Sequence, residues 1–482
     1  MINFRPIARV VAILLAIVGV MMWTGIPFSL YYGESVWPLL LAGLGSLAAG
    51  GLLFLVKNPK GIPIRKREGY LIVVLSWAAM VLSGMVPYLL SGVVSTFPDA
   101  LFETVSGMTT TGASVLTDIE IQPRGILYWR SLTQWIGGMG IIVLTVAIFP
   151  LLGIGGIELF AAEAPGPTSD KLHPRISETA KRLWFIYVGL TVTLFFCLWA
   201  AGMSKYESVN HALTTMATGG FSTRNASAAA FSPLIQYILI LFMFFAGVNY
   251  TVLYLSFKRR FKEVWKSDEL KAYLVIVFAL TAFFTAKVWY ATGGTNLEGA
   301  FRDSLFQIVS LITTTGFVTA DYTSWATSLT IICFVLLFLG ACAGSTSGGI
   351  KLIRHLVFLK NSYLEFKRIV HPSAIVPLRV NQEVVPGKII THVFNFLLLY
   401  LLLFIVGSVI LATMGLDFNT SLGAMATSLG NVGPGIGGVG PVDNFAWLSP
   451  GIKVFLSFVM IIGRLEIYTV LVLFTPFFWR LN

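Results

Sequence analysis

Two stretches of the chain, 204 residues apart, carry nearly the same sequence. Residues 101–112 read LFETVSGMTTTG and residues 305–316 read LFQIVSLITTTG, so eight of twelve positions are identical. Threonines followed by glycine are unfavourable inside a helix, because Thr is restricted at its first side-chain torsion and Gly loses much backbone entropy. The same residues are suited to ending a helix and turning backbone carbonyl oxygens to one side, where they can replace the water around a cation.

Two weaker copies of this pattern occur elsewhere in the chain. They are HALTTMATGGFS at residues 211–222 and ATSLGNVGPG at residues 426–435. The glycines that match the four copies, separated by 107, 97 and 117 residues, are Gly112, Gly219, Gly316 and Gly433. A period of about 100 residues predicts an internal fourfold repeat. Connectors that contain Thr and Gly by chance are the alternative, and the similarity of the first and third copies argues against it.

The composition indicates a membrane protein. The 482 residues are 56% hydrophobic and only 11% charged, and many apolar runs are long enough to cross a bilayer. Hydropathy predicts an all-α, polytopic fold with ten transmembrane helices near residues 8–30, 36–56, 69–91, 127–152, 181–203, 234–257, 271–292, 325–358, 386–415 and 447–478. The three cysteines lie in apolar runs and are odd in number, so neither a disulfide framework nor a zinc site is indicated.

The net charge of +11 raises the question of nucleic-acid binding, and the positions of the charges answer it. Lys and Arg gather in loops at residues 57–67, 258–271 and 351–388. These loops fall on one side of the membrane if both termini are cytoplasmic, as the positive-inside rule expects. We therefore expect a multi-pass protein of the lipid bilayer with both termini in the cytoplasm and no nucleic-acid partner.

Four outer connections, after the third, fifth, seventh and ninth spans, each hold a short apolar helical run that ends in Gly-containing sequence. Each repeat is therefore predicted to contain a span, a half-helix that enters the membrane and returns, and a second span, in the M1-P-M2 order of a potassium channel. The predicted domains are a two-helix extension at residues 1–60 and pore repeats at 61–156, 157–260, 261–380 and 381–482. Only the third repeat is expected to have a broken M2 helix.

Four such re-entrant loops would satisfy a strict physical condition. Non-helical backbone is tolerated at membrane depth only where protein buries it or where it lines a watery cavity. Each half-helix would point its C-terminus, the negative end of its dipole, towards the bilayer centre, where it favours a cation. The fourfold pattern therefore predicts an ion pathway.

The span–loop–span pattern, the TTTG segments and the fourth segment GNVGPG resemble the Trk/Ktr/HKT superfamily of potassium transporters over nearly the whole chain. In this superfamily a serine at the first filter glycine is associated with sodium permeability, and four glycines with potassium preference. The resemblance implies potassium uptake through a selectivity filter, with potassium as the substrate and no covalent cofactor. The potassium-binding residues that it implies are Thr110, Thr111, Gly112, Ala217, Thr218, Gly219, Thr314, Thr315, Gly316, Asn431, Val432 and Gly433.

The eighth predicted span is interrupted by LGACAGSTSGGIK at residues 339–351, where a continuous helix is unfavourable. Small residues also favour tight packing between helices, so an interface is the alternative. The resemblance implies an intramembrane gating loop here, with Arg464 beside it. Because a charge at mid-span is costly unless it is paired or hydrated, an ion pair with an unidentified acid is the alternative role for this arginine. The implied gate residues are Gly340, Gly344, Ser345, Thr346, Ser347, Gly348, Gly349 and Arg464.

Two other classes of protein are alternatives to a channel-like transporter. A proton- or sodium-coupled symporter would need facing carboxylates at membrane depth, and Glu466 is the one plausible deep acid. A membrane enzyme would need a cluster of catalytic groups at that depth, so the chain is not expected to be an enzyme. The GIGGVG at residues 435–440 follows a half-helix rather than a strand, which argues against a dinucleotide site.

The resemblance also implies partners. It implies a homodimer in the bacterial cytoplasmic (inner) membrane, docked on a cytoplasmic NAD- or ATP-binding regulatory subunit of the TrkA-like type. The basic inner loops are where we expect that contact. The outer acidic residues could be ordinary solvated charges or could concentrate cations at a funnel; they are Asp99, Glu103, Glu207, Glu298, Asp303, Asp321, Asp417 and Asp443.

Overall fold

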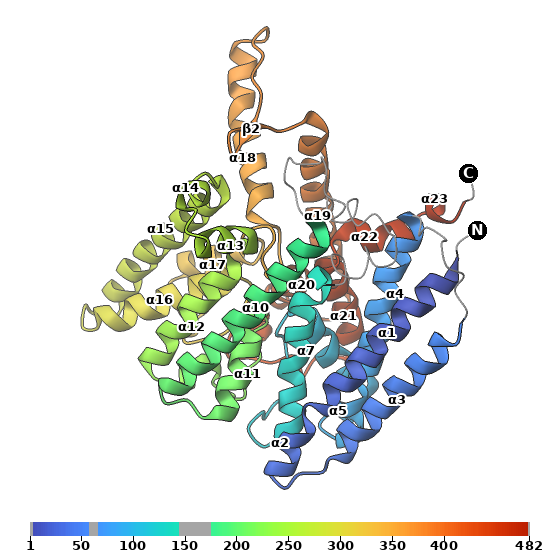
Figure 1. Ribbon diagram of the computed structural model, residues 1–482. Coiled ribbons are helices and arrows are strands. Elements are labelled where there is room, and N and C mark those ends of the chain that lie inside the picture. Colours follow the sequence, from blue (N-terminus) through green and yellow to red (C-terminus); the bar gives the residue numbers. More distant parts are fainter. Residues whose placement is uncertain (1–2, 57–65, 144–174, 481–482) are drawn as a thin grey trace.

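The computed structural model describes residues 3–56, 66–143 and 175–480, and most of these residues are helical (Figure 1). The exception to the expected all-α fold is a pair of two-residue antiparallel strands, β1 (Arg379–Val380) and β2 (Glu383–Val384). The domain boundaries predicted after residues 60 and 156 lie outside the described residues.

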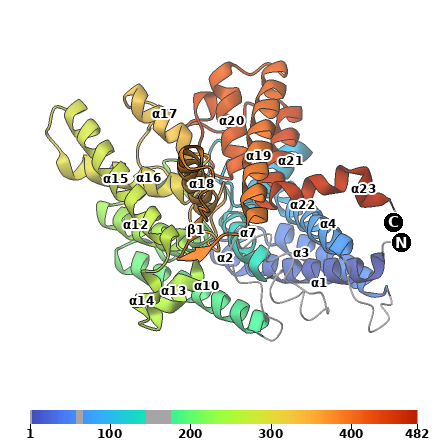
Figure 2. The same ribbon diagram turned by 90° about the horizontal axis from the view of Figure 1, so that it is seen from above.

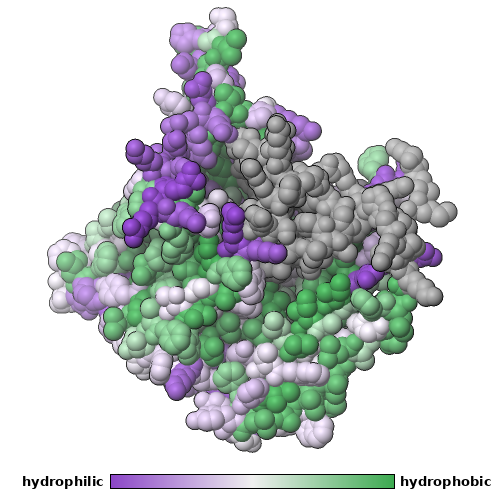
Figure 3. All heavy atoms as spheres, viewed as in Figure 1, coloured by the Kyte–Doolittle hydropathy of each residue, from purple (hydrophilic) through white to green (hydrophobic). Residues whose placement is uncertain are grey.

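The described residues contain six helical segments that are long and apolar enough to cross a membrane, and two bent pairs raise this to eight if each pair counts as one span. The helices of the six segments are α1 (Phe4–Trp23) with α2 (Ile26–Tyr31), α3 (Trp37–Phe54), α4 (Lys66–Gly84) with α5 (Val86–Ser91), α10 (Arg175–Ala200), α15 (Asp268–Ala291) and α19 (Gly387–Thr413). Hydrophobic side chains cover much of the face shown in Figure 3, and hydrophilic ones gather at the end that carries α14 (Phe261–Val264) and α18 (Leu352–Val370). The chain is therefore a multi-pass membrane protein.

The sixth predicted span is not one helix. It is divided into α12 (Pro233–Gly247) and α13 (Tyr250–Phe257), whose axes are bent by 107°. Asn249 lies in the break and caps α13, because its Oδ1 accepts a hydrogen bond of 2.8 Å from the amide of Thr251.

The tenth predicted span is also broken, so the prediction that only the third repeat has a broken helix is wrong. It is divided into α21 (Pro450–Arg464) and α22 (Ile467–Leu471), with a bend of 115°. Glu466 lies between them with a φ of 59°, a conformation that cannot continue a right-handed helix.

The fourth and eighth predicted spans begin as expected. The fourth begins as α7 (Arg124–Val143), and its predicted end at residues 144–152 lies outside the described part of the chain. The eighth consists of α17 (Thr327–Leu336), a non-helical stretch and then α18.

Four shorter helices correspond to the predicted half-helices. They are α6 (Phe97–Met108), α11 (Lys205–Met216), α16 (Leu297–Ile312) and α20 (Phe418–Gly430). Each begins at a capping side chain that accepts a hydrogen bond from the backbone amide three residues further on, which satisfies one of the free amides of the first turn. The caps are Thr96, Ser204, Asn296 and Asp417.

The half-helices are held between long helices of successive repeats. In the first repeat, α6 contacts α7 of the same repeat and α21 of the fourth repeat. In the second repeat, α11 contacts α7 of the first repeat, and in the third repeat, α16 contacts α12 of the second. The carbonyl oxygen of Leu337, just after α17, lies beside Gly430 at the end of α20. Seen from above, the repeats follow one another around the molecule in sequence order (Figure 2).

The two ends of the described chain lie close together (Figure 1). The amide of Asn3 donates a hydrogen bond of 2.8 Å to Glu68 Oε1, and Arg67 Nη1 donates one of 2.6 Å to the carbonyl oxygen of Arg480. The start of α1 and α23 (Pro476–Trp479) therefore both lie at the beginning of α4.

Candidate functional site

All four half-helices end in the same backbone turn. In each turn a residue with a φ of 53–55° is followed, two positions later, by a glycine with a φ of 76–99°. A non-glycine residue at positive φ is uncommon, so its recurrence at four equivalent places indicates one repeated geometry. The turns run over Thr110–Gly112, Thr218–Gly220, Thr314–Gly316 and Asn431–Gly433.

The second turn is shifted by one residue from the predicted position. The prediction that matched Gly219 with Gly112 is wrong, because the glycine with the equivalent φ of 76° is Gly220. The half-helix α11 ends one residue later than the match assumed, since Ala217 still has helical angles of −73° and −11°. The residues of the second turn are therefore Thr218, Gly219 and Gly220, and Ala217 lies outside it.

The four turn glycines close into a ring, which we call the glycine ring. Each faces a backbone carbonyl oxygen of the next repeat so closely that an added Cβ atom would collide with it. The pairs, in order, are Gly112 with Gly219 O, Gly220 with Thr315 O, Gly316 with Val432 O and Gly433 with Thr111 O. Because the last pair returns to the first repeat, the four turns surround one axis and no side chain fits at the ring glycines.

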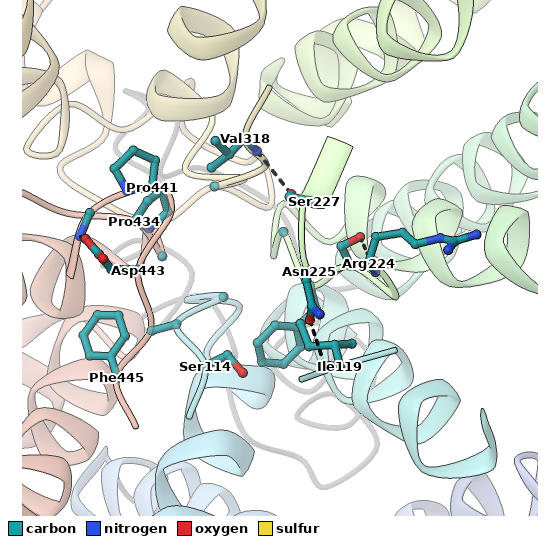
Figure 4. Close-up of a pocket in the computed structure, with 18 of the residues that line it drawn as sticks. Ser114, Ile119, Arg224, Asn225, Ser227, Val318, Pro434, Pro441, Asp443 and Phe445 are labelled. Atoms are coloured by element: carbon teal, nitrogen blue, oxygen red, sulfur yellow. Dashed lines mark hydrogen bonds between the residues drawn. The ribbon is translucent and has the colours of Figure 1, made fainter. Parts of the chain in front are cut away.

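A cavity of about 110 Å³ lies against the glycine ring (Figure 4). All four ring glycines line it, together with residues that follow them in the chain. Figure 4 shows Ser114, Asn225, Val318 and Pro434 arranged around this opening from four different parts of the chain. One side of the ring is therefore open to a small polar space.

A buried ion pair supports the wall of this cavity. Arg130 Nε lies 2.6 Å from Glu103 Oε1, and both side chains are almost completely buried. Arg130 Nη1 also donates a hydrogen bond of 3.1 Å to the carbonyl oxygen of Ser222, and its guanidinium carbon lies 3.5 Å from the centre of the Phe221 ring. The pair joins the first two repeats beside the ring, where a charge left alone would be very costly.

Several of the outer acidic residues have partners rather than being free solvated charges. Ion pairs of 2.6–2.7 Å join Asp99 to Lys453, Glu207 to Arg224 and Glu298 to Arg302. The side chain of Asp417 caps α20, and its hydrogen bonds with Thr420 hold the pKa of this carboxyl below its usual value. These four acids therefore have structural roles in ion pairs or helix capping.

The stretch Gly340–Gly349 is non-helical, as the sequence predicted, and we call it the 340–349 segment. The amide of Gly348 donates a hydrogen bond of 2.6 Å to Thr314 Oγ1, and Thr346 Oγ1 donates one of 3.0 Å to the carbonyl oxygen of Met216. Both partners precede a ring glycine, whereas the cavity is lined by the ring glycines and residues that follow them. The segment therefore lies on the other side of the ring from the cavity.

Arg464 contacts this segment directly. Its Nη1 donates a hydrogen bond of 2.9 Å to the carbonyl oxygen of Thr346, and its Nη2 donates one of 3.1 Å to that of Gly137 on α7. The sequence predicted the contact with the segment but not the contact with Gly137. Glu466 forms its ion pair with Arg354 at 2.7 Å instead.

Two anchors hold the ends of the 340–349 segment. Glu269 Oε1, on α15, accepts hydrogen bonds of 2.8 Å from the amide of Ala343 and 3.0 Å from that of Ile353. Lys351 Nζ donates to the carbonyl oxygen of Ser347 and, at 3.2 Å, to its hydroxyl. One carboxylate thus pins both sides of the break.

The sequence prediction missed Gly220 and Glu269. Matching the Gly-Phe-Ser at residues 220–222 with the Gly-Ala-Ser at residues 112–114 would have found Gly220. Nothing in the sequence distinguishes Glu269 from an ordinary acid in the first turn of a helix, where carboxylates are common.

The long apolar helices, the half-helices between them and the ring of backbone groups define a multi-pass membrane protein of the cation-transporter class. Residues 41–481 match the TrkH family of cation transport proteins. The Trk system potassium uptake protein TrkH of Escherichia coli (strain K12) is 39% identical over 484 residues, which is 99% of this chain and 100% of that protein. The protein of the same name from Halomonas elongata is 38% identical over 483 residues, with the same coverage.

A solved structure supports the same assignment. The crystal structure of the potassium transporter TrkH from Vibrio parahaemolyticus matches with a TM-score of 0.89 at 36% sequence identity, over 99% of this chain and 100% of that chain. This chain belongs to the TrkH family.

Proposed function

We propose that this protein takes up potassium across the cytoplasmic membrane of a bacterium, with the glycine ring as its selectivity filter. The observation that carries the proposal is the closed cycle in which four glycines face four carbonyl oxygens. Backbone carbonyls around one axis can replace the hydration shell of a potassium ion. Relatives named as potassium uptake proteins, matched over their whole length, support the same activity.

In this proposal the chain crosses the membrane ten times. The six long segments, the two bent pairs, α7 and the eighth span that begins with α17 supply the crossings. The half-helices α6, α11, α16 and α20 are the re-entrant pore helices, and their C-terminal ends favour a cation at the ring. The ligands are main-chain oxygens of the four turns, with Thr218, Gly219 and Gly220 as the second quarter.

The 340–349 segment is the proposed gate. It lies against the residues that precede the ring glycines and is held by Arg464, Glu269 and Lys351. An ion that leaves the ring on this side meets the segment, so conduction requires the segment to move. The hydrogen bonds between this segment and other parts of the chain stabilise a closed state, and a regulator can shift the balance between that state and an open one.

A channel-like passage is favoured over coupled symport. The acid that coupling would use, Glu466, receives two hydrogen bonds from Arg354, at 2.8 and 2.7 Å. A carboxylate whose two oxygens both accept hydrogen bonds from an arginine is poorly placed to exchange a proton during each transport cycle.

The proposed regulator is a cytoplasmic nucleotide-binding subunit that contacts a homodimer of this chain. α18 extends away from the body of the molecule (Figure 1) and exposes Leu359, Tyr363 and Phe366 by 61–75% among basic residues. Its base adjoins the 340–349 segment, so a force on this helix would reach the gate. In this proposal both termini also lie on the cytoplasmic side, and the closeness of the two ends of the described chain supports a shared side for them.

Uptake by cells tests the proposal. The chain is expressed in a bacterium that lacks its own potassium-uptake systems, and the entry of potassium and sodium is measured at low external potassium. We expect growth and potassium entry that depend on the protein, with potassium preferred over sodium. A correctly inserted protein that carries both ions equally, or that carries neither, would contradict the proposal.

A further inference from the structure

Three of the four turns share a hydrogen bond that the second turn lacks. In repeats one, three and four, a hydroxyl located six residues before the ring glycine reaches forward to a carbonyl at or just after that glycine. The bonds are Ser106 Oγ to Ala113 O at 2.5 Å, Ser310 Oγ to Phe317 O at 2.7 Å and Thr427 Oγ1 to Gly433 O at 2.7 Å. The equivalent hydroxyl of repeat two, Thr214 Oγ1, donates to the carbonyl oxygen of Asn210 at 3.1 Å, back along its own helix.

Gln134 of α7 supplies the second turn with different bonds. Its Nε2 donates a hydrogen bond of 2.7 Å to the carbonyl oxygen of Gly219, and its Oε1 accepts one of 3.1 Å from the amide of Phe221. The side chain is completely buried. Its amide therefore holds the backbone on both sides of the ring glycine Gly220.

The same side chain explains why residue 219 is a glycine. The equivalent positions in the other turns carry Thr111, Thr315 and Val432, whose side chains are buried. A Cβ atom on Gly219 would collide with the carboxamide of Gln134, which already fills that space. Gln134 and Gly219 thus form a matched pair from two different repeats.

We propose that Gln134 is a positioning residue that sets the ion preference of the glycine ring by fixing the carbonyl oxygen of Gly219. The inference rests on the proposed function of the ring as a potassium filter. The carbonyl of Gly219 is the one that faces Gly112, and it is equivalent to the carbonyls that face the other three ring glycines. A carbonyl oxygen has two lone pairs, so the bond from Gln134 leaves one for an ion.

The second turn needs such support more than the others. It contains two successive glycines, which have the widest backbone freedom of any residues, and it lacks the hydroxyl bond of the other turns. Without Gln134 the Gly219 carbonyl can rotate away or approach the axis, and a ring of variable size accommodates the smaller sodium ion better. The preference for potassium should therefore fall while transport continues.

The test measures potassium entry, sodium entry and their ratio for Gln134→Met in cells without other potassium-uptake systems. Met has a similar length and is apolar, so the change removes both hydrogen bonds with little change in volume. We expect the potassium/sodium ratio to fall by about three- to tenfold, the factor that one hydrogen bond of ordinary strength makes in an equilibrium. The matched control is Gln236→Met on α12, because Gln236 is also a buried amide that donates to backbone carbonyls, those of Ala228 and Phe231, away from the ring.

A second pair of variants separates positioning from general stability. Gly219→Thr alone should lose potassium selectivity because its side chain collides with Gln134, and Gln134→Ala/Gly219→Thr should recover part of it by giving the second turn the side chain of the first and third. An unchanged ratio in Gln134→Met, or equal losses in Gln134→Met and Gln236→Met, would overturn the inference. If the unaltered protein itself shows no potassium preference, the proposed function fails instead.

Discussion

Arg464 Nη1 donates a hydrogen bond of 2.9 Å to the carbonyl oxygen of Thr346, which joins the last long helix before its bend to the 340–349 segment. The same guanidinium reaches the carbonyl oxygen of Gly137 at 3.1 Å. A planar group with five donors can hold two backbone segments at fixed positions, which a lysine ammonium does less well. The charge therefore lies next to the proposed cation path and also fastens the proposed gate.

Replacing Arg464 should loosen that gate. In Arg464→Met the hydrogen bonds to Thr346 and Gly137 are lost, and each bond of a charged donor contributes about 1.5–3 kcal/mol. We expect the leak of rubidium from proteoliposomes without a regulatory partner to rise by at least about tenfold, because 1.4 kcal/mol corresponds to that factor. Arg464→Lys keeps the charge but not the two-point contact and should give an intermediate leak. A folded Arg464→Met protein with an unchanged leak would contradict the role.

The register of the second turn gives a separate prediction. Gly220→Ser places a side chain at a φ of 76° and against the carbonyl oxygen of Thr315, and the left-handed conformation alone costs an L-residue about 1–2 kcal/mol. We expect Gly220→Ser and Gly112→Ser both to lower the potassium/sodium uptake ratio, because both residues belong to the ring. The control is Gly189→Ser on α10, where nothing lies within 4 Å of an added Cβ. Normal selectivity in Gly220→Ser would exclude Gly220 from the ring.

The sequence predicted the turn glycines of the first, third and fourth repeats correctly. It misplaced the turn glycine of the second repeat, and the reason is physical. Gly112 and Gly316 each follow three threonines, so the two sequences align at these glycines without ambiguity. Gly219 and Gly220 are identical neighbours, so a match made on the first glycine alone depends on where α11 ends, whereas the Phe-Ser that follows points to Gly220. Helix ends cannot be placed from sequence to better than one or two residues.

The two bends were not predicted either, although polar residues lie at both of them, Asn249 at the first and Arg464 and Glu466 at the second. The break between α12 and α13 is stabilised from outside, since the amide of Cys342 donates to the carbonyl oxygen of Gly247 at 3.0 Å and the amide of Tyr250 to that of Gly344 at 3.1 Å. Helix breaks have identifiable local causes, and here the cause is another part of the chain, more than ninety residues away.

The link between the proposed gate and the ring can be tested at Thr314. The hydroxyl of Thr314 accepts the 2.6 Å hydrogen bond from the amide of Gly348. Thr314→Val has nearly the same shape but leaves this buried amide unsatisfied, which costs about 1–3 kcal/mol. We expect the closed segment to be destabilised and the leak of rubidium from proteoliposomes to increase. Thr314→Ser keeps the hydroxyl and should keep the leak low, and equal leaks in the two variants would argue against a role for this bond.

The pair of Arg354 and Glu466 distinguishes a structural acid from a coupling acid. Arg354 Nη2 donates to both carboxylate oxygens of Glu466 and so joins α18 to the bend after α21, with side-chain exposures of 8% and 21%. Glu466→Ala leaves the arginine charge without its partner, and breaking a buried pair costs about 3–5 kcal/mol. We expect a large fall in thermal stability, with partial recovery in Arg354→Met/Glu466→Ala because no lone charge remains.

The transport assay on the same variants completes this prediction. If Glu466 serves structure alone, the double variant, which has no carboxylate at this position, should still carry potassium, and proton movement measured with an internal pH dye should stay as it is in the unaltered protein. A symporter that used Glu466 to carry protons would lose proton movement together with potassium uptake in that variant. Because the double variant removes both charges, such a loss could not be attributed to a buried arginine left unpaired, and it would identify Glu466 as a coupling group.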